Sequence, residues 1–360
     1  MTASPAARPP STRALDLEAA ARASVGLLVP LLVLLAVDRL DLALYASFGA
    51  FTGLYGRNER YRLRLASVGA AAGMMLVAIA TGVLLSLAEA PLALEAVGLA
   101  IVLGGASLVS TAMSLVPPHP LFPVFGLVVC AAVPVDAAQA RDALVTAVAA
   151  ILFSAGVCMS GWLLRRWAPD AHAHRFRALP RVPVRDAAVH RDPAAWTAVA
   201  ANVAGALVAG GIAVALGLGH HYWAVVTLVA VLPVVRGPLS FTRVAHRVLG
   251  TLAGSVVAAG ILALHLPVAA VIAVAVACQF AAELAVGRHY GLALVFITPL
   301  ALVMGGLGRT QPVIPLVADR VVDTAVGAAV GVAVILVLRA LARRRARREG
   351  PAGGSPRAAA

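Results

Sequence analysis

Runs of about twenty apolar residues recur along almost the whole length of this 360-residue chain. A helix of about twenty residues is long enough to cross the hydrocarbon core of a bilayer, which is about 30 Å thick. Hydrophobic residues make up 61% of the sequence and charged residues only 12%, roughly half the share in soluble domains. Because lipid offers the backbone no hydrogen-bonding partner, such runs predict helices. The sequence therefore predicts an all-α integral membrane protein.

The apolar runs form two sets of six, separated by a polar stretch. The first set predicts spans at 23–37, 42–56, 65–88, 92–116, 119–135 and 143–164. The second set predicts spans at 195–217, 221–235, 248–264, 267–286, 289–306 and 320–341. We therefore expect about twelve transmembrane helices, as two six-helix repeats at 23–164 and 195–341. The other segments are a disordered N-terminal tail (1–22), a basic linker (165–194) and a basic disordered C-terminal tail (342–360).

The distribution of arginine determines the expected topology. The chain has 29 basic residues, all of them arginine, and a formal net charge of +13. With a cytoplasmic N-terminus, all but four arginines fall in cytoplasmic segments, and the exceptions are Arg39, Arg141, Arg309 and Arg320. This is the bias that the positive-inside rule requires. We expect a multi-pass protein of the cell membrane with both termini in the cytoplasm, whose charge serves topology and lipid contact rather than nucleic-acid binding.

Similar residues recur at matching positions in the two halves. Arg62 precedes Gly69 and Gly73 at the same spacing by which Arg243 precedes Gly250 and Gly254. Each half has an even number of predicted spans, so both run in the same direction, as in a parallel repeat. Glycines four residues apart, including Gly327 and Gly331, predict close helix packing, although they also suit helices that slide past each other.

The second span of each half is the shortest. A helix of fifteen residues rises only about 22 Å, so 42–56 or 221–235 would thin the bilayer if it faced lipid. We therefore expect both segments inside the bundle. Short or proline-interrupted segments at matching positions point to a transporter's binding site, and the fifth spans, 119–135 and 289–306, contain prolines. The sequence predicts a substrate path between these four segments.

Three sequence motifs follow one another in the second half. The first is YWAVVTLVAVLP, a basic loop and HRVLGTLAGS, and it contains Tyr222, Trp223, Arg247, Gly250 and Gly254. HYGLALVFITPLAL and RVVDTAVGAAVG are the second and third. In this order the motifs resemble those of the FUSC family, inner-membrane proteins of the fusaric-acid-resistance and aromatic-acid-exporter type. The resemblance implies an exporter of aromatic or other small organic acids, coupled to protons. The linker is too short for the soluble domain of many relatives, which argues against a periplasmic adaptor.

Aromatic and hydroxyl-bearing residues of the short spans and their neighbours are candidates for the substrate path: Tyr45, Phe48, Tyr222, Trp223, Thr227 and Thr298. A membrane-interface belt or interhelical hydrogen bonds explain the same residue types. Arg62, Arg243 and Arg247 are candidates for attracting an anion to the cytoplasmic mouth.

Ionisable residues inside a membrane are costly and are therefore candidates for function. Asp323 and Glu283 are the candidates for proton coupling. The alternatives are ion pairs, of Asp323 with Arg320 and of Glu283 with Arg288. His220 and His221, at the outer mouth, suit either proton sensing or a solvated pair.

No phosphate-binding loop, nucleophile elbow or metal-ligand spacing occurs in the sequence. We therefore expect no enzyme activity, catalytic residue, cofactor or metal. The expected partners are the bilayer and a small organic anion, and a homo-oligomer is compatible with the sequence. A passive channel, or a scaffold that acts through the arginine-rich linker and tail, remains an alternative to an exporter.

Overall fold

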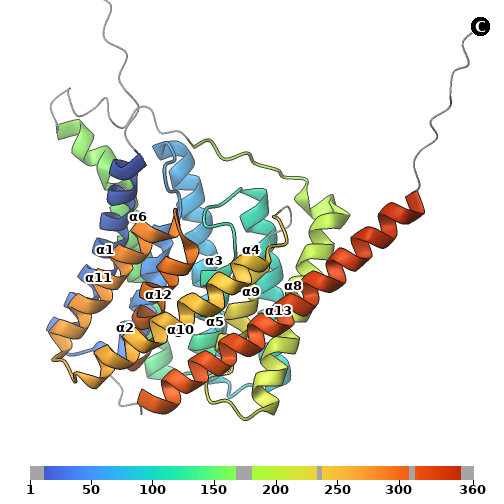
Figure 1. The fold of residues 1–360 in the computed structure, drawn as a ribbon. Helices are drawn as coiled ribbons and strands as arrows, with labels where there is room; N and C mark the ends of the chain where they lie inside the picture. The colour runs from blue at the N-terminus through green and yellow to red at the C-terminus, as the bar shows by residue number, and fades with distance from the viewer. Residues whose placement is uncertain (1–11, 168–180, 233–236, 308–312, 350–360) are drawn as a thin grey trace, which may run out of the picture.

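The structure, a computed structural model, describes residues 12–167, 181–232, 237–307 and 313–349. In these ranges all regular secondary structure is helical. The one β-type pairing among the described residues is an isolated bridge between Glu59 and Arg181. The helices pack side by side as one bundle (Figure 1). The all-α class predicted from the sequence is confirmed.

Eight described helices are long and apolar enough to cross a membrane. They are α1 (Thr12–Ala36), α3 (Tyr61–Leu87), α4 (Leu92–Ala112), α6 (Ala137–Trp167), α8 (Pro193–Ala215), α10 (Phe241–Ala263), α11 (Val268–Val286) and α13 (Val313–Glu349). Four shorter apolar helices alternate with them. They are α2 (Ala43–Ala50), flanked by the 3-10 turns η1 (Leu40–Leu42) and η2 (Phe51–Leu54), α5 (Leu121–Ala131), α9 (Tyr222–Val231) and α12 (Tyr290–Gly306).

Each of the twelve predicted spans overlaps one of these helices, but the second and fifth helices of each half are shorter than a span. Proline and glycine account for the early ends. Leu232 is extended because Pro233 follows it, and α5 begins directly after Pro120. Gly56, just after η2, has a φ of +72°, which only glycine adopts readily.

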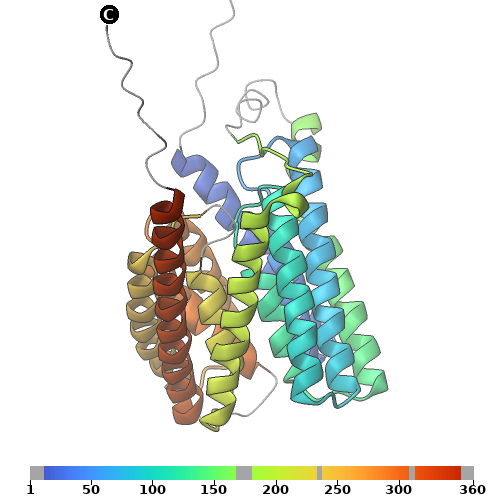
Figure 2. The same ribbon diagram turned by 90° about the vertical axis from the view of Figure 1, so that its right-hand side faces the viewer.

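The chain ends differ from the predicted boundaries. α1 begins at Thr12, within the tail predicted to be disordered, and α13 continues to Glu349, beyond the predicted end at 341. Residues 1–11, 168–180 and 350–360 lie outside the described residues. The start of α1 and the end of α13 lie at the same end of the bundle (Figure 2), as an even number of crossings requires. We call this end the terminal end and the opposite one the distal end.

The shortest helices lie inside the bundle, as their length predicts. Every residue of α9 from Trp223 to Val231 is buried, and so is every residue of α2 except Leu44. α9 packs against α8 and α13, and α2 packs against α1 and α6. Longer helices thus keep the ends of the short helices away from lipid, where unpaired backbone groups would be costly.

The two halves have corresponding helix contacts. α3 packs against α5 and α6, and α10 packs against α12 and α13. Between the halves, α1 contacts α11 and α4 contacts α8, while α2 contacts α12 and α5 contacts α9. Each contact between the halves therefore has a counterpart in which the halves are exchanged, as a two-fold axis between them would produce.

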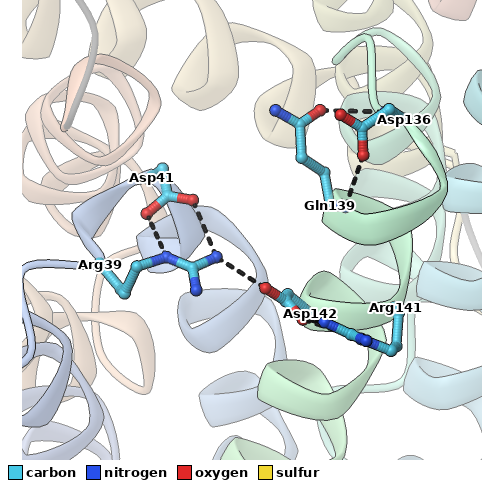
Figure 3. Close-up of polar contacts among 6 residues, drawn as sticks. All are labelled: Arg39, Asp41, Asp136, Gln139, Arg141 and Asp142. Atoms are coloured by element: carbon cyan, nitrogen blue, oxygen red, sulfur yellow. Dashed lines mark hydrogen bonds and ion pairs between the residues drawn. The ribbon is translucent and has the colours of Figure 1, made fainter.

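Local ion pairs account for two of the four arginines outside the predicted cytoplasmic segments. Arg39 contacts Asp41 at 3.1 Å and Asp142 at 3.0 Å, and Arg141 contacts Asp142 at 3.0 Å (Figure 3). Hydrogen bonds to Asp41 and then Asp142 raise the pKa of Arg39. Beside them, Asp136 and Gln139 bond reciprocally at the start of α6 (Figure 3), as in a capping box. Arg309 lies outside the described residues.

The described part of the linker is attached to the first half. Arg181 pairs with Glu59, which is fully buried and also accepts a hydrogen bond from Ser67 at 2.7 Å. Arg181 also donates to the carbonyl oxygen of Ser114, and Ser114 donates to that of Val184. These bonds hold the loops before α3 and after α4 together at the terminal end.

Glycines bring helices close together at two of the three predicted pairs. A Cβ atom on Gly250 would overlap the carbonyl oxygen of Gly291, and one on Gly254 would lie 2.7 Å from the Cβ of Thr298. Gly327 and Gly331 of α13 meet α9 in the same way. The prediction is wrong for Gly69 and Gly73, because a Cβ at either position would have no described atom within 4 Å.

We predict that Gly250→Ala destabilises the protein by about 1–3 kcal/mol, the usual cost of overpacking, because α10 must move away from α12. Gly69→Ala is the matched control: its methyl group meets open space, and alanine favours a helix by about 1 kcal/mol over glycine. Thermal unfolding in detergent, followed by circular dichroism, measures both. Equal midpoints would contradict the close approach of α10 and α12.

Candidate functional site

A cavity of about 360 Å³ lies between the two halves of the bundle. Its walls come from all four short helices, α2, α5, α9 and α12, and from α10, α11 and α13. Its volume is typical of a small-molecule site. The segments between which the sequence places the substrate path therefore all border one cavity.

Aromatic rings form one wall of the central cavity. The Phe48 and Phe125 rings meet edge to face at 5.0 Å, and the Trp223 ring lies 4.8 Å from Phe125. Phe51 and Phe122 continue this wall, with their ring centroids 5.0 Å apart. The rings belong to both halves of the chain, and their faces and edges suit a planar apolar group.

Arg320 enters the cavity from α13. Its side chain is almost fully buried, and its guanidinium carbon lies 3.8 Å from the centre of the Trp223 ring. Its Nε and Nη1 atoms have no hydrogen-bond partner among the described residues. Buried charged groups are usually paired, so these nitrogens point to a ligand with an acceptor.

Arg247 enters from α10 and is also buried. Its contacts to the Tyr290 and Thr227 hydroxyls are long, at 3.5 Å, and its Nε has no partner among the described residues. Thr227 and Trp223 lie one turn apart on α9, so Arg247 and Arg320 meet α9 at points about 6 Å apart along its axis. Their charges interact across the cavity. We call Arg247 and Arg320 the arginine pair.

The terminal end of the cavity has balanced charge. Arg57 contacts Asp16 at 2.6 Å and Glu283 at 3.5 Å, and Asp16 also contacts Arg288 at 2.9 Å. The alternative that Glu283 pairs with Arg288 is therefore wrong. Because α1 and α11 come from different halves, this network joins the halves where the cavity approaches the surface.

The predicted cationic residues separate into two groups. Arg243 and Arg247 line the cavity, and the Arg243 guanidinium lies 4.2 Å from the centre of the Tyr290 ring while its Nε donates to the carbonyl oxygen of Ala230. Arg62 is exposed on α3 and does not line the cavity. The structure thus brings two of the three arginines together.

The six predicted substrate-path residues lie at different depths. Phe48 and Trp223 line the cavity, and Thr227 lies behind its wall against Arg247. Tyr45 is buried in α2, and Thr298 is buried against Gly254. Tyr222 does not line this cavity but a second pocket at the distal end.

Asp323 is fully buried in α13, and neither of its carboxylate oxygens has a hydrogen-bond partner among the described residues. No ion pair with Arg320 is found in this part of the chain, since Arg320 turns to Trp223 instead. The acid that does pair is Asp319, whose Oδ2 lies 2.7 Å from Nδ1 of His220. The alternative of a helix-end ion pair for Asp323 is therefore wrong, and so is that of a merely solvated His220.

A second, smaller pocket of about 120 Å³ lies at the distal end. His220, Tyr222 and Gly305 help to line it. Trp223 and Ala301 line both this distal pocket and the central cavity, so they separate the two spaces.

Sequence patterns did not single out several cavity residues. Phe51, Phe122, Phe125, Gln279 and Tyr290 line the cavity, but nothing in their spacing distinguishes them from ordinary apolar or interfacial residues. Arg320 did give a signal, because it is one of the few arginines outside the predicted cytoplasmic segments. An arginine outside the cytoplasmic segments does not follow the positive-inside rule and is therefore a candidate for a role other than topology.

His119 lies in the loop between α4 and α5 and lines the cavity. Burial lowers its pKa to about 3, and the charge of Arg243 adds to the lowering. Its ring also lies against the backbone of Val229 and Leu232 at the end of α9. The imidazole is therefore neutral at physiological pH and links the first half to the second.

We predict that His119 makes the fold sensitive to acid. The pKa of His119 is lower in the folded protein than the ordinary 6.5, so the unfolded state binds more protons between these values and stability falls as pH falls from about 6.5 toward 3. His119→Asn should lose less thermal stability than the natural sequence on acidification from neutral pH to about pH 5. His190→Asn, at an exposed histidine of the linker, is the control. Equal acid sensitivity of His119→Asn and the natural sequence would contradict this.

Comparison with known proteins agrees with the motifs in the second half. No curated protein and no solved structure matches the chain. The family model described as "Fusaric acid resistance protein-like" matches residues 207–334, a region that runs from α8 into α13 and contains Trp223, Arg247 and Arg320. This match confirms the resemblance predicted from the motifs: residues 207–334 are similar to the FUSC family.

Proposed function

We propose that this protein is a membrane transporter that exports aromatic or other small organic acids and is coupled to the proton gradient. The apolar helices and the FUSC match support the general assignment to membrane transport. One observation carries the choice of substrate: Arg247 and Arg320 are buried beside an aromatic wall, and nitrogens of both lack partners among the described residues.

A carboxylate fits the arginine pair. Guanidinium groups bind carboxylates through parallel, charge-assisted hydrogen bonds, which are about twice as strong as neutral ones. In a cavity with apolar walls, this attraction is stronger than it is in water. The anionic group of the substrate contacts Arg247 and Arg320, and its ring packs against Phe125 and Trp223.

The division of the space by Trp223 and Ala301 favours a transporter over a passive channel. A channel needs a continuous path, whereas here the central cavity and the distal pocket are separated. Alternating access instead moves one half against the other around a central site. The buried arginine pair also argues against a scaffold, because buried charges without partners are costly and serve no purpose in a merely structural bundle.

The two halves act as parallel six-helix repeats, and the short helices complete twelve crossings. The corresponding contacts between the halves support this arrangement. The protein lies in the cell membrane, and its terminal end faces the cytoplasm. The concentration of arginine in the segments at that end supports this orientation. An organic anion then enters past the Arg57 and Glu283 network and reaches the arginine pair at the deeper end of the cavity.

Asp323 and Glu283 are the residues proposed to exchange protons. Glu283 borders the cavity, and Asp323 is buried one turn beyond Arg320 on α13. Carboxylates within a membrane bundle are costly when charged, which favours uptake of a proton. Both lie close to arginines, so their charge state changes the field that an anion meets.

We predict that Arg320→Gln and Arg247→Gln each weaken benzoate binding by about 1.5–3 kcal/mol, roughly tenfold to a hundredfold, because charge-assisted hydrogen bonds are lost. Isothermal titration calorimetry of the purified protein measures this loss. Arg62→Gln, at an exposed position on α3, should bind like the natural sequence. If all three variants bind benzoate equally, the arginine pair is not the carboxylate site.

We predict that an imposed proton gradient drives labelled benzoate across membranes of vesicles that contain the protein, and that Asp323→Asn or Glu283→Gln reduces this flux. The folded state of each variant is checked by its thermal unfolding. Counterflow of labelled against unlabelled benzoate, which needs no gradient, is the control. Flux that is indifferent to the gradient would remove proton coupling, and saturable counterflow would still distinguish a transporter from a channel.

A further inference from the structure

The barrier between the two spaces is the indole of Trp223 opposite the methyl group of Ala301. These two residues line both the central cavity and the distal pocket. Trp223 is buried at the first turn of α9, and Ala301 lies in α12. A ligand that moves from the arginine pair toward the distal end therefore meets this indole.

Ring contacts and a charge hold the Trp223 indole in place. The Phe125 ring lies 4.8 Å and the Tyr222 ring 5.1 Å away, and the Arg320 guanidinium covers one face at 3.8 Å. A buried tryptophan usually donates its N–H to an acceptor. Here Nε1 has no hydrogen-bond partner among the described residues, so no directional bond has to break when the ring turns.

Arg320 therefore has two competing contacts. Without ligand, its charge rests on the indole face, and its Nε and Nη1 atoms have no partner among the described residues. A carboxylate offers charge-assisted hydrogen bonds, which are stronger than the attraction of a cation to an aromatic face. Binding of an anion thus draws the guanidinium away from Trp223.

We propose that Trp223 is the distal gate of the transport path, that Arg320 holds it closed, and that a bound carboxylate releases it into the distal pocket, which is the exit half of the path. This inference rests on the proposed function, because it needs an anion at the arginine pair. Gly305, which lines the distal pocket without contacts at its Cβ position, leaves room on that side.

A second contact joins the same two helices at the distal surface. His220, two residues before α9, pairs with Asp319, which directly precedes Arg320 on α13. Near the gate, two side-chain contacts thus join α9 and α13: the contact of His220 with Asp319 at the surface and that of Arg320 with Trp223 beneath it. Release of Arg320 leaves the contact between His220 and Asp319 in place.

Cysteine labelling tests the gate without any ligand. The reporter is Ile297→Cys, which lines the central cavity but not the distal pocket, in a chain whose three native cysteines are replaced by alanine. A membrane-impermeant maleimide is added from the distal side of membrane vesicles. We expect labelling about tenfold faster with Trp223→Ala than with Trp223→Phe, which keeps an aromatic barrier.

Two further variants make this result specific. Val129→Ala removes bulk from the wall of the distal pocket but not from the barrier, and we expect its labelling rate to equal that of the natural residue. Ala301→Leu thickens the barrier and should slow labelling. If Trp223→Ala labels no faster than Val129→Ala, Trp223 is not the gate.

Fluorescence of Trp223 tests its release. In a variant whose other tryptophans, Trp162, Trp167 and Trp196, are replaced by phenylalanine, benzoate should increase quenching of Trp223 by acrylamide. With Arg320→Gln, quenching should be high without benzoate and should not respond to it. Unchanged quenching in the presence of bound benzoate would overturn the release by Arg320.

Calorimetry on the same samples distinguishes failure of the gate proposal from failure of the proposed substrate site. If benzoate binds but neither quenching nor labelling changes as expected, the gate is wrong and the proposed substrate site stands. If benzoate does not bind, the proposed site fails and the release mechanism fails with it. The labelling rates of Trp223→Ala and Val129→Ala still decide whether Trp223 is a barrier.

Discussion

A helix too short to cross the bilayer must be enclosed by longer ones, and this constraint organises the whole bundle. α2, α5, α9 and α12 are each shorter than the hydrocarbon core is thick, so their terminal backbone groups need protein around them. The long helices supply that enclosure. Where four short helices from two halves meet, they do not fill the centre, and the space left there is the cavity. The cavity is thus a consequence of helix length.

The two halves treat their buried arginines differently. In the first half, Arg64 is buried like Arg247, but it donates to the carbonyl oxygens of Gly56 and Cys158. In the second half, Arg247 and Arg320 have nitrogens with no partner in the described part of the chain. Backbone carbonyls therefore satisfy one arginine, while the other two keep unpartnered nitrogens beside the cavity. The cavity-lining arginines with unpartnered nitrogens thus lie in one half, the half that contains the match to the FUSC family model.

The pattern of apolar runs predicted much of the fold. A helix in lipid must be long enough to span the bilayer, and its backbone groups must form hydrogen bonds within the protein. The apolar pattern located twelve helical segments and the enclosure of 42–56 and 221–235, and the motifs indicated the family. The sequence pattern gave wrong predictions where a contact depends on the direction in which a side chain points. Gly69 and Gly73 have the spacing of Gly250 and Gly254 but face outward. Arg320 and Asp323 lie one turn apart, which suggests an ion pair, yet Arg320 prefers an aromatic face. Which way a side chain points depends on neighbours from distant helices, which one sequence does not specify.

The backbone contacts of His119 have a consequence for any motion of this bundle. They attach a loop of the first half to the last turn of α9 in the second, while the linker attaches the same loop to the base of α3. If the halves rocked as rigid blocks, one of these attachments would have to stretch. A rearrangement that preserves the His119 contacts carries the α4–α5 loop along with α9. The parts that move together then differ from the two sequence repeats. α9 of the second half and the α4–α5 loop of the first half move as one rigid body.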